Sequence, residues 1–146
     1  MNLYAARDLA RALMNQHGLS YWVFVFDRAR RRFGSCQPRR QCITLSRTLT
    51  FLNGEDEVRD TILHEIAHAL APGDGHGTKW KAQCLRIGAR PIRCYDDDSV
   101  ETPLRRPARF QIGCPACGWW TERHRRTRRR LICRKCRRDV VLRAKM

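Results

Sequence analysis

The segment His64-Glu65-Ile66-Ala67-His68 is an HExxH pattern, and it constrains this chain more than any other five residues. On a helix, two histidines four residues apart lie on one face, where both imidazoles can bind one metal ion. The intervening glutamate then lies beside the water that such a metal activates. The pattern predicts a metal-dependent hydrolase site of the peptidase kind.

The HExxH pattern specifies only three of its five positions. The alternative to a metal site is therefore a helix that carries two surface histidines. The flanking residues favour a buried helix over residues 55–70. Acidic residues occupy its first turn, between Asp56 and Asp60, where they complement the helix dipole. Apolar residues with helical spacing form a stripe for a core, namely Val58, Ile62, Ile66, Ala69 and Leu70.

A third ligand is expected just after this helix. Residues 71–75 break the helix, and His76 follows between Gly75 and Gly77. Because the two glycines have no side chains, the backbone at this point can come close to a metal. A catalytic zinc takes three protein ligands and a water molecule, so we predict His76 as the third ligand. The alternative is that His76 is an ordinary polar loop residue. His17 and His124 have no comparable setting and are assigned to the surface.

Glu65 is the predicted catalytic residue. With zinc bound by His64, His68 and His76, Glu65 would accept a proton from the attacking water and pass it to the leaving amine. No serine or cysteine nucleophile is needed. The alternative for Glu65 is a solvated helix residue without a chemical role.

A second metal site is predicted near the C-terminus. Two CxxC pairs, Cys114/Cys117 and Cys133/Cys136, are separated by fifteen residues, which is the spacing of a four-thiolate structural zinc site. Disulfides or redox pairs are the alternatives. The pattern predicts a zinc ribbon whose folding depends on its metal, which brings the expected number of zinc ions to two.

The other four cysteines lack ligand spacing and are expected to be ordinary thiols, although a pairing of Cys36 with Cys42 across a turn stays open. They are Cys36, Cys42, Cys84 and Cys94.

Positive charge is concentrated at the C-terminal end. Of a net charge of +16, residues 101–146 contribute +12, from 15 Lys and Arg against 3 Asp and Glu. Guanidinium groups pair with phosphates and release counterions, and indoles can stack on bases, so we predict sequence-nonspecific DNA binding here. A solvated basic face and a small core covered by tryptophans are the alternatives. The candidate residues are Arg123, Arg125, Arg126, Arg128, Arg129, Arg130, Trp119 and Trp120.

The 146 residues have room for one compact domain and a small appendage. We expect a domain over residues 1–95, a linker over 96–109 with an Asp96-Asp97-Asp98 run, and a ribbon over 110–146. No apolar stretch is long enough to span a bilayer, and no signal peptide is evident. The expectation is a monomeric cytoplasmic protein associated with DNA and not with a membrane.

Hydrophobic periodicity predicts an α+β fold with a small antiparallel sheet. The strand at 42–46 is expected to line or support the cleft, more as a structural element than as a direct contact. The predicted helices are 3–17, 55–70 and 78–85, and the predicted strands are 21–26, 41–46, 118–121 and 131–132.

Several of these segments together resemble the SprT-like metalloproteases. They are the Ile43-Thr44-Leu45-Ser46 strand, the His64–Ala69 motif, the Asp74-Gly75-His76-Gly77 turn before Trp80, and the trailing ribbon. The resemblance implies a minimal zincin-like fold with His64, His68 and His76 as zinc ligands and Glu65 as the catalytic glutamate. For Spartan-type relatives it implies DNA-dependent cleavage of proteins crosslinked to DNA. The sequence stops soon after the ribbon, so the partner-recruiting tail of eukaryotic relatives is not expected.

The expected function is therefore a DNA-associated zinc endopeptidase acting on DNA-bound proteins. One alternative is a non-enzymatic nucleic-acid-binding protein that keeps the fold as a scaffold. A second is a general zinc peptidase that does not depend on DNA. DNA or RNA, strand preference and physiological substrate are left open by the sequence.

Overall fold

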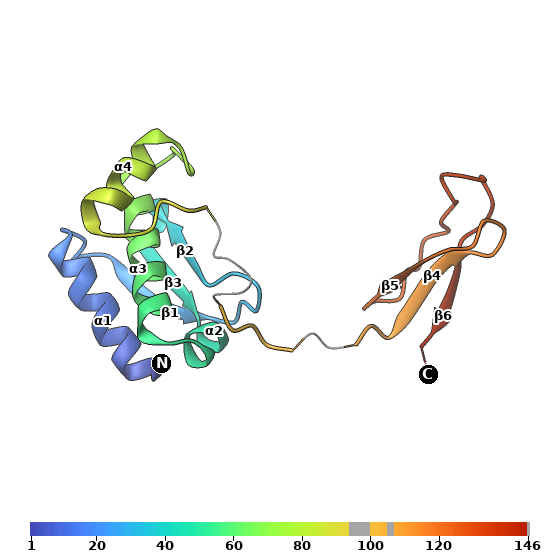
Figure 1. Cartoon of the computed structure of the whole chain (residues 1–146), viewed down its shortest axis with the longest axis horizontal. Coiled ribbons are helices and arrows are strands. Elements are labelled where there is room, and N and C mark those ends of the chain that lie inside the picture. The colour runs from blue at the N-terminus through green and yellow to red at the C-terminus, as the bar shows by residue number, and fades with distance from the viewer. Residues whose placement is uncertain (94–99, 105–106, 146) are drawn as a thin grey trace. The chain divides into compact units, whose positions relative to one another are not determined.

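A computed structural model of the chain describes residues 1–93, 100–104 and 107–145. Cys94 and the Asp96-Asp97-Asp98 run lie outside the described residues. The chain divides into two compact units, Met1–Pro103 and Leu104–Met146 (Figure 1).

The first unit holds four α-helices, one short 3-10 helix and three strands within its described residues. They are α1 (Leu3–Gln16), β1 (Val23–Asp27), β2 (Gly34–Gln37), the 3-10 helix Pro38–Arg40, β3 (Cys42–Ser46), α2 (Arg47–Leu52), α3 (Glu55–Leu70) and α4 (Thr78–Ile87). The predicted α+β class and the order of helix, small sheet and HExxH-bearing helix are confirmed. The short elements α2 and β2 were not predicted, because neither carries a clear apolar period.

The sheet of this unit is mixed, so the prediction of an antiparallel sheet is wrong. Strand β3 lies in the centre, parallel to β1 and antiparallel to β2. The chain reverses between β1 and β2 and again through the 3-10 turn before β3, so β3 runs in the same direction as β1. The central place suits β3 because Ile43 and Leu45 are both fully buried.

Helix α3 packs over this sheet and carries the candidate site. Its residues Val58, Ile62 and Ile66 are spaced four apart and fully buried, as the apolar stripe predicted. They share one core with β3 and with Ala6, Ala10 and Met14 of α1. Figure 1 shows α1 and α3 on one side of the sheet. The core therefore fixes α3 from one side and leaves its opposite side toward a cleft.

The second unit is a three-stranded antiparallel sheet with the order β5-β4-β6. Its strands are β4 (Phe110–Cys114), β5 (Trp119–Arg123) and β6 (Val141–Ala144). Only β5 was predicted as a strand. Ile132 forms an isolated bridge with Asp139, so the expected strand at 131–132 is wrong. Backbone pairing there ends after one residue pair because the chain turns into the second CxxC segment.

Part of the predicted 96–109 linker belongs to the two units. Val100 is buried in the core of the first unit, and the Asn53 side chain bonds both the N–H and the carbonyl of Glu101. In the second unit, Ala108 is buried and Arg109 accepts a backbone hydrogen bond from Lys145. Among the described residues, no helix is long and apolar enough to cross a bilayer.

Candidate metal centres and cleft

The three predicted histidines converge on one point. The Nε2 atoms of His64 and His76 are 3.3 Å apart, and each lies 3.2 Å from Nε2 of His68. Two nitrogens bound to one tetrahedral zinc at 2.0–2.1 Å are roughly 3.3 Å apart, so this donor set fits such an ion without rearrangement. The fold brings His76 to the helix because the chain turns back between α3 and α4.

The local sequence explains this turn. Gly73 and Gly75 adopt φ values of +83° and +59°, a region that other residues enter at a cost. Asp74 accepts a hydrogen bond from the Trp80 N–H at 2.9 Å and thereby ties the turn to the start of α4. Gly77 lies so close to Asp74 that a Cβ there would come within 2.7 Å of its carboxylate. His76 therefore lies in a turn that is held in place between α3 and α4.

Trp80 forms the floor beneath the three imidazoles. Its indole ring lies 4.6 Å from the ring centre of His76, 4.8 Å from that of His64 and 5.2 Å from that of His68. The side chain is 0% exposed, and its Nε1 has no hydrogen-bond partner within the described part of the chain. An aromatic ring in contact with all three imidazoles orients them as ligands through packing alone.

The electrostatics of the histidines also suit a metal. Burial, with the neighbouring histidines, lowers the pKa of His64 to about 4 and that of His68 to about 4. Burial and the charge of Arg93 lower the pKa of His76. All three imidazoles are therefore neutral near pH 7, and a neutral imidazole offers the lone pair that a metal needs.

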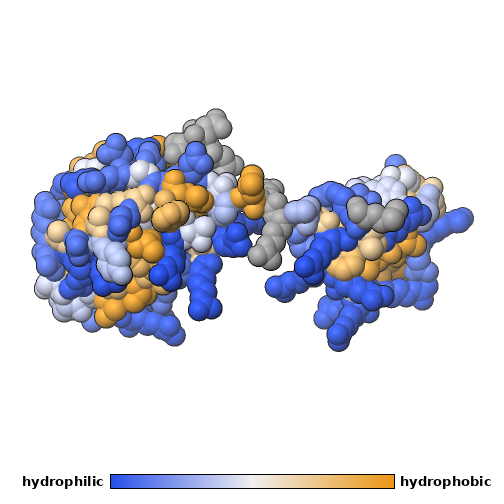
Figure 2. Space-filling model, turned by 90° about the horizontal axis from the view of Figure 1, so that it is seen from below, coloured by the Kyte–Doolittle hydropathy of each residue, from blue (hydrophilic) through white to orange (hydrophobic). Residues whose placement is uncertain are grey.

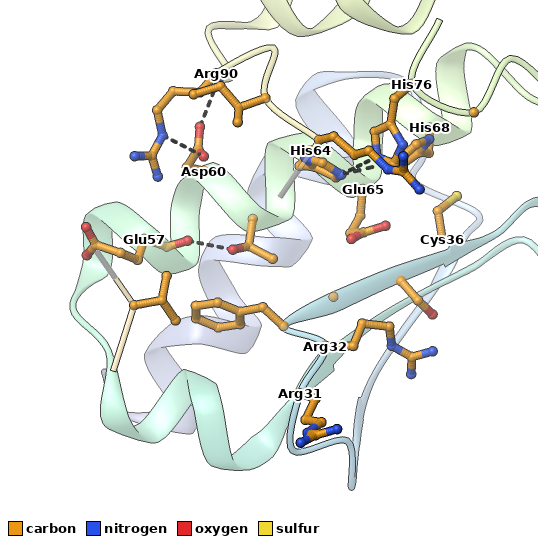
Figure 3. A pocket seen from close by; sticks show the side chains of 18 of the residues that line it. Arg31, Arg32, Cys36, Glu57, Asp60, His64, Glu65, His68, His76 and Arg90 are labelled. Atoms are coloured by element: carbon orange, nitrogen blue, oxygen red, sulfur yellow. Dashed lines mark hydrogen bonds and ion pairs between the residues drawn. The ribbon is translucent and has the colours of Figure 1, made fainter. Parts of the chain in front are cut away.

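Glu65 lies beside this cluster in an enclosed position (Figure 3). It is only 6% exposed, and burial raises its pKa to about 8, while Arg32 and the backbone N–H of Cys36 act in the opposite direction. Gly34 of β2 packs directly against its carboxylate. A carboxyl group with a pKa near neutrality can both accept and return a proton at physiological pH.

The cluster opens into a cleft of about 1240 Å³. One wall is α3, which contributes His64, Glu65 and His68, and another is β2 with the loop before it. The strand that lines the cleft is thus β2 and not β3, which supports β2 from the centre of the sheet. The structure adds four cleft arginines that the sequence analysis did not assign to the site, namely Arg31, Arg32, Arg90 and Arg93.

The second candidate metal centre is in the second unit. The Sγ atoms of Cys114 and Cys136 are 3.2 Å apart and those of Cys117 and Cys133 are 3.6 Å apart, and all four lie within 4.8 Å of one another. Sulfurs around a tetrahedral zinc at 2.3 Å are roughly 3.8 Å apart, so the set fits this ion. Backbone N–H groups of Cys136 and Lys135 lower the pKa of Cys133 to about 6, and the hydrogen bond with Cys136 lowers the pKa of Cys114, which favours their thiolates. Although backbone N–H groups act in the opposite direction, the neighbouring thiols raise the pKa of Cys117 and of Cys136, so zinc binding at this site would release protons from these two groups.

Outside this cluster, Cys36, Cys42 and Cys84 are free thiols, as predicted, and no disulfide joins Cys36 to Cys42. Cys36 lines the cleft, and burial, with Glu65 and Cys42 nearby, raises its pKa to about 12.

The two candidate tryptophans of the ribbon differ in their surroundings. Trp120 packs on Gly113, where a Cβ would come within 2.4 Å of its Cδ2 atom, and Arg143 lies over its ring at 4.5 Å. Trp119 is 48% exposed. Trp120 is therefore committed to the unit's own packing, whereas the Trp119 ring is open to solvent.

The candidate arginines of the ribbon all lie on its surface. Arg123 ends β5, and the other five follow in the segment up to residue 130. The two carboxylates of this unit are already paired, Asp139 with Arg130 and Glu122 with Lys145. Figure 2 shows hydrophilic side chains projecting from this unit around a smaller apolar area. The remaining arginines thus form a cationic surface with no acidic partner among the described residues of the unit.

Comparison with known proteins places these observations in a family. The sequence profile of the SprT-like family matches residues 7–101, which include α3, the turn and α4. The chain belongs to the SprT-like family. The predicted resemblance is thereby confirmed.

Two bacterial relatives, both called Protein SprT, show the range of similarity of this SprT-like chain. That of Pseudomonas putida (strain W619) is 33% identical over 104 residues, which cover 61% of this chain and 60% of the relative. That of Glaesserella parasuis serovar 5 is 25% identical over 146 residues, which cover 94% and 93%. This SprT-like chain thus spans about 60% of the length of the Pseudomonas relatives that it matches.

Among solved structures, this SprT-like chain is similar to the metallopeptidase zymogen of Methanocaldococcus jannaschii jannalysin. The superposition covers 64% of this chain and 85% of the jannalysin chain. The overlap has a TM-score of 0.49 and 13% sequence identity.

Proposed function

We propose that this SprT-like chain is a zinc endopeptidase that cleaves proteins bound or crosslinked to DNA in the cytoplasm. The observation that carries the proposal is the meeting of three Nε2 atoms within 3.3 Å of one another, beside an enclosed glutamate in an open cleft. Zinc at this point would supply Lewis acidity to a substrate carbonyl and lower the pKa of water.

The chain's own residues would do the rest. The ion would be bound by His64, His68 and His76. Because their imidazole rings are neutral, they would not cancel the positive charge of the ion. Glu65 would accept the proton of the attacking water and return it to the leaving amine, because its carboxyl group lies enclosed beside the three ligands. The edge strand β2 offers backbone groups along the cleft, so an extended substrate chain can pair with it. Cleavage would then depend little on the side chains of the substrate.

The ribbon is the proposed nucleic-acid contact. Its exposed arginines have no carboxylates left to pair with in the described part of their own unit, and guanidinium groups bind phosphates through pairs of hydrogen bonds. Of the two tryptophans, only Trp119 presents a free ring face for stacking on a base. Holding DNA would raise the local concentration of proteins attached to it without any sequence motif in the substrate.

The experiment incubates the zinc-loaded protein with a DNA-binding protein substrate, with and without DNA. Glu65→Gln is run in parallel, because it removes the proton acceptor and leaves the three ligands. We expect cleavage with DNA only, a loss of at least about 100-fold in rate for Glu65→Gln, and unchanged zinc content of that variant.

Other outcomes assign the function differently. Cleavage at the same rate without DNA indicates a general peptidase. No cleavage under any condition, with DNA binding intact, indicates a scaffold protein. Wild-type cleavage by Glu65→Gln would remove the role proposed for this carboxyl group.

A further inference from the structure

A smaller pocket of about 500 Å³ adjoins the cleft at His76. Its lining is Gly75, His76, Trp80, Lys81, Pro91 and Arg93. Apart from the candidate ligand, the groups that carry charge in this lining are Lys81 and Arg93, and no described carboxylate lines it. The pocket is therefore cationic and opens directly beside the candidate metal centre.

Lys81 and Arg93 differ from Arg32 and Arg90 of the main cleft, which are both paired with carboxylates. Arg32 pairs with Asp27, and Arg90 pairs with Asp60 at 2.9 Å through both its backbone N–H and its side chain. No hydrogen bond or ion pair of Lys81 or Arg93 side chains occurs within residues 1–93, 100–104 and 107–145. Asp74 in the neighbouring turn bonds the Trp80 amide and does not line the pocket.

The charges along the cleft are also asymmetric. Glu57 and Asp60 lie on α3 toward one end, whereas His68 and His76 lie toward the other (Figure 3). Arg93 lines both the main cleft and the small pocket, so it adds positive charge at the His76 end, whereas Asp60 at the other end is paired with Arg90. A peptide lying along α3 would thus meet the positive charges of Lys81 and Arg93 on the His76 side of the metal centre.

We infer that the Lys81–Arg93 pocket binds a carboxylate side chain of the substrate, an Asp or Glu next to the cleaved bond. This inference rests on the proposed peptidase function and adds a side-chain preference to it. The pocket is large enough to hold an Asp or Glu side chain, and His76 is part of its lining, so a residue adjacent to the scissile carbonyl can reach it. Nucleic-acid phosphate is the competing ligand, but a small recess beside a catalytic centre fits a side chain better than a duplex.

The test uses the full zinc-loaded chain and two peptides that differ only by Glu or Gln at one position near the cleavage site. The same pair is measured for binding by fluorescence anisotropy with Glu65→Gln protein and for cleavage with wild type. We expect the Glu peptide to bind roughly fivefold tighter, since a partly exposed ion pair contributes up to about 1 kcal/mol. The preference should fall in high salt.

Variants then locate the effect. Arg93→Gln and Lys81→Gln should each reduce the Glu preference, and Arg93→Glu should replace it with a preference for a Lys peptide. Lys79→Gln, on the exposed surface of α4 and outside both pockets, is the matched control and should keep the preference. The measurements are repeated with Asp96, Asp97 and Asp98 replaced by asparagine, so that the chain's own carboxylates cannot compete.

The outcomes separate the two proposals. Cleavage of both peptides with equal affinity overturns the carboxylate pocket and leaves the peptidase function intact. Selective binding of the Glu peptide without any cleavage supports the pocket and counts against the peptidase. Loss of oligonucleotide affinity in Arg93→Gln, with peptide discrimination unchanged, assigns the pair to phosphate and overturns the inference.

Discussion

Gly34 determines how closely β2 approaches Glu65. A Cβ at this position would lie 2.7 Å from the Glu65 Oε1 atom, 2.8 Å from its Cγ and 3.0 Å from Thr61 Cγ2. These distances are shorter than van der Waals contact, so either the strand or the glutamate would have to move. The absence of a side chain at one residue thus sets the place of the proposed proton acceptor.

We predict that Gly34→Ala lowers peptidase activity at least about tenfold while zinc content stays the same, with a stability loss of about 1–3 kcal/mol from overpacking. Activity, metal content and urea unfolding are the measurements. Gly54→Ala is the control, since a Cβ there meets only the flexible end of Glu57 at 3.4 Å. Full activity of Gly34→Ala would mean that β2 does not position Glu65.

Trp80 gives a second prediction for a single residue. Trp80→Phe leaves a smaller ring under three imidazoles, so the ligands lose packing on one side, and we expect zinc affinity to fall about tenfold. Competition with a chromophoric chelator measures this. Trp22→Phe is the control, because Trp22 is also buried with an Nε1 that has no partner among the described residues, and it lies outside the group of rings around the histidines. Equal affinity losses in both variants would point to general destabilisation.

Among the elements, the end of β1 is linked to β3 by a polar cluster. The Asp27 carboxylate accepts hydrogen bonds from the Ala29 N–H at 2.8 Å, from the Thr44 hydroxyl at 2.8 Å and from Arg32. Burial raises the pKa of Asp27, but these bonds outweigh it and hold the pKa below its ordinary value of 3.8. The ionised carboxylate therefore stabilises the parallel pair of strands.

We predict that Asp27→Asn lowers the free energy of unfolding by about 1 kcal/mol near pH 7. Because the folded-state pKa is lowered, wild type has this advantage above pH 3.8 and loses it as the pH falls through the folded-state value. Urea unfolding between pH 3 and 7 measures the difference. Asp8→Asn, exposed on α1, is the control. A difference that stayed the same at and below pH 3 would contradict the assignment.

At the scale of the full chain, the two units have different sources of stability. The first unit has a shared core of α1, α3 and the sheet. The second has few buried apolar side chains among its described residues, Ala108 and Ile112 besides the cysteines Cys114 and Cys133. A unit with so small a core needs another contribution, and a structural zinc site supplies on the order of 10 kcal/mol.

We predict two zinc ions per chain and selective unfolding on metal removal. Cys133→Ser should leave one zinc, unfold the second unit and preserve the core of the first, whereas Cys42→Ser should change neither. Metal analysis and hydrogen exchange resolved along the chain measure both effects. Protection of residues 110–144 in the metal-free protein would show that this unit folds without zinc.

How much could be read from the sequence differs between the features of the site. The α3 bounds and the convergence of His64 with His68 follow from local rules, because helix ends and four-residue spacing depend on neighbouring residues. His76 could be proposed from its glycine turn. The cluster of four cysteines in the ribbon followed from two CxxC spacings. These patterns are local, so one sequence was enough to find them.

The remaining features depend on contacts between distant segments. Residues 34–37 have no apolar period, yet β2 lines the cleft because it pairs with β3 and packs on Glu65 through Gly34. The parallel pairing of β1 with β3, the floor made by Trp80 and the cationic pocket of Lys81 and Arg93 arise in the same way. Local sequence patterns specified the ligands and the helix that carries them. Tertiary packing alone set which strand, which indole and which charges surround them, since burial and pairing are properties of the folded chain.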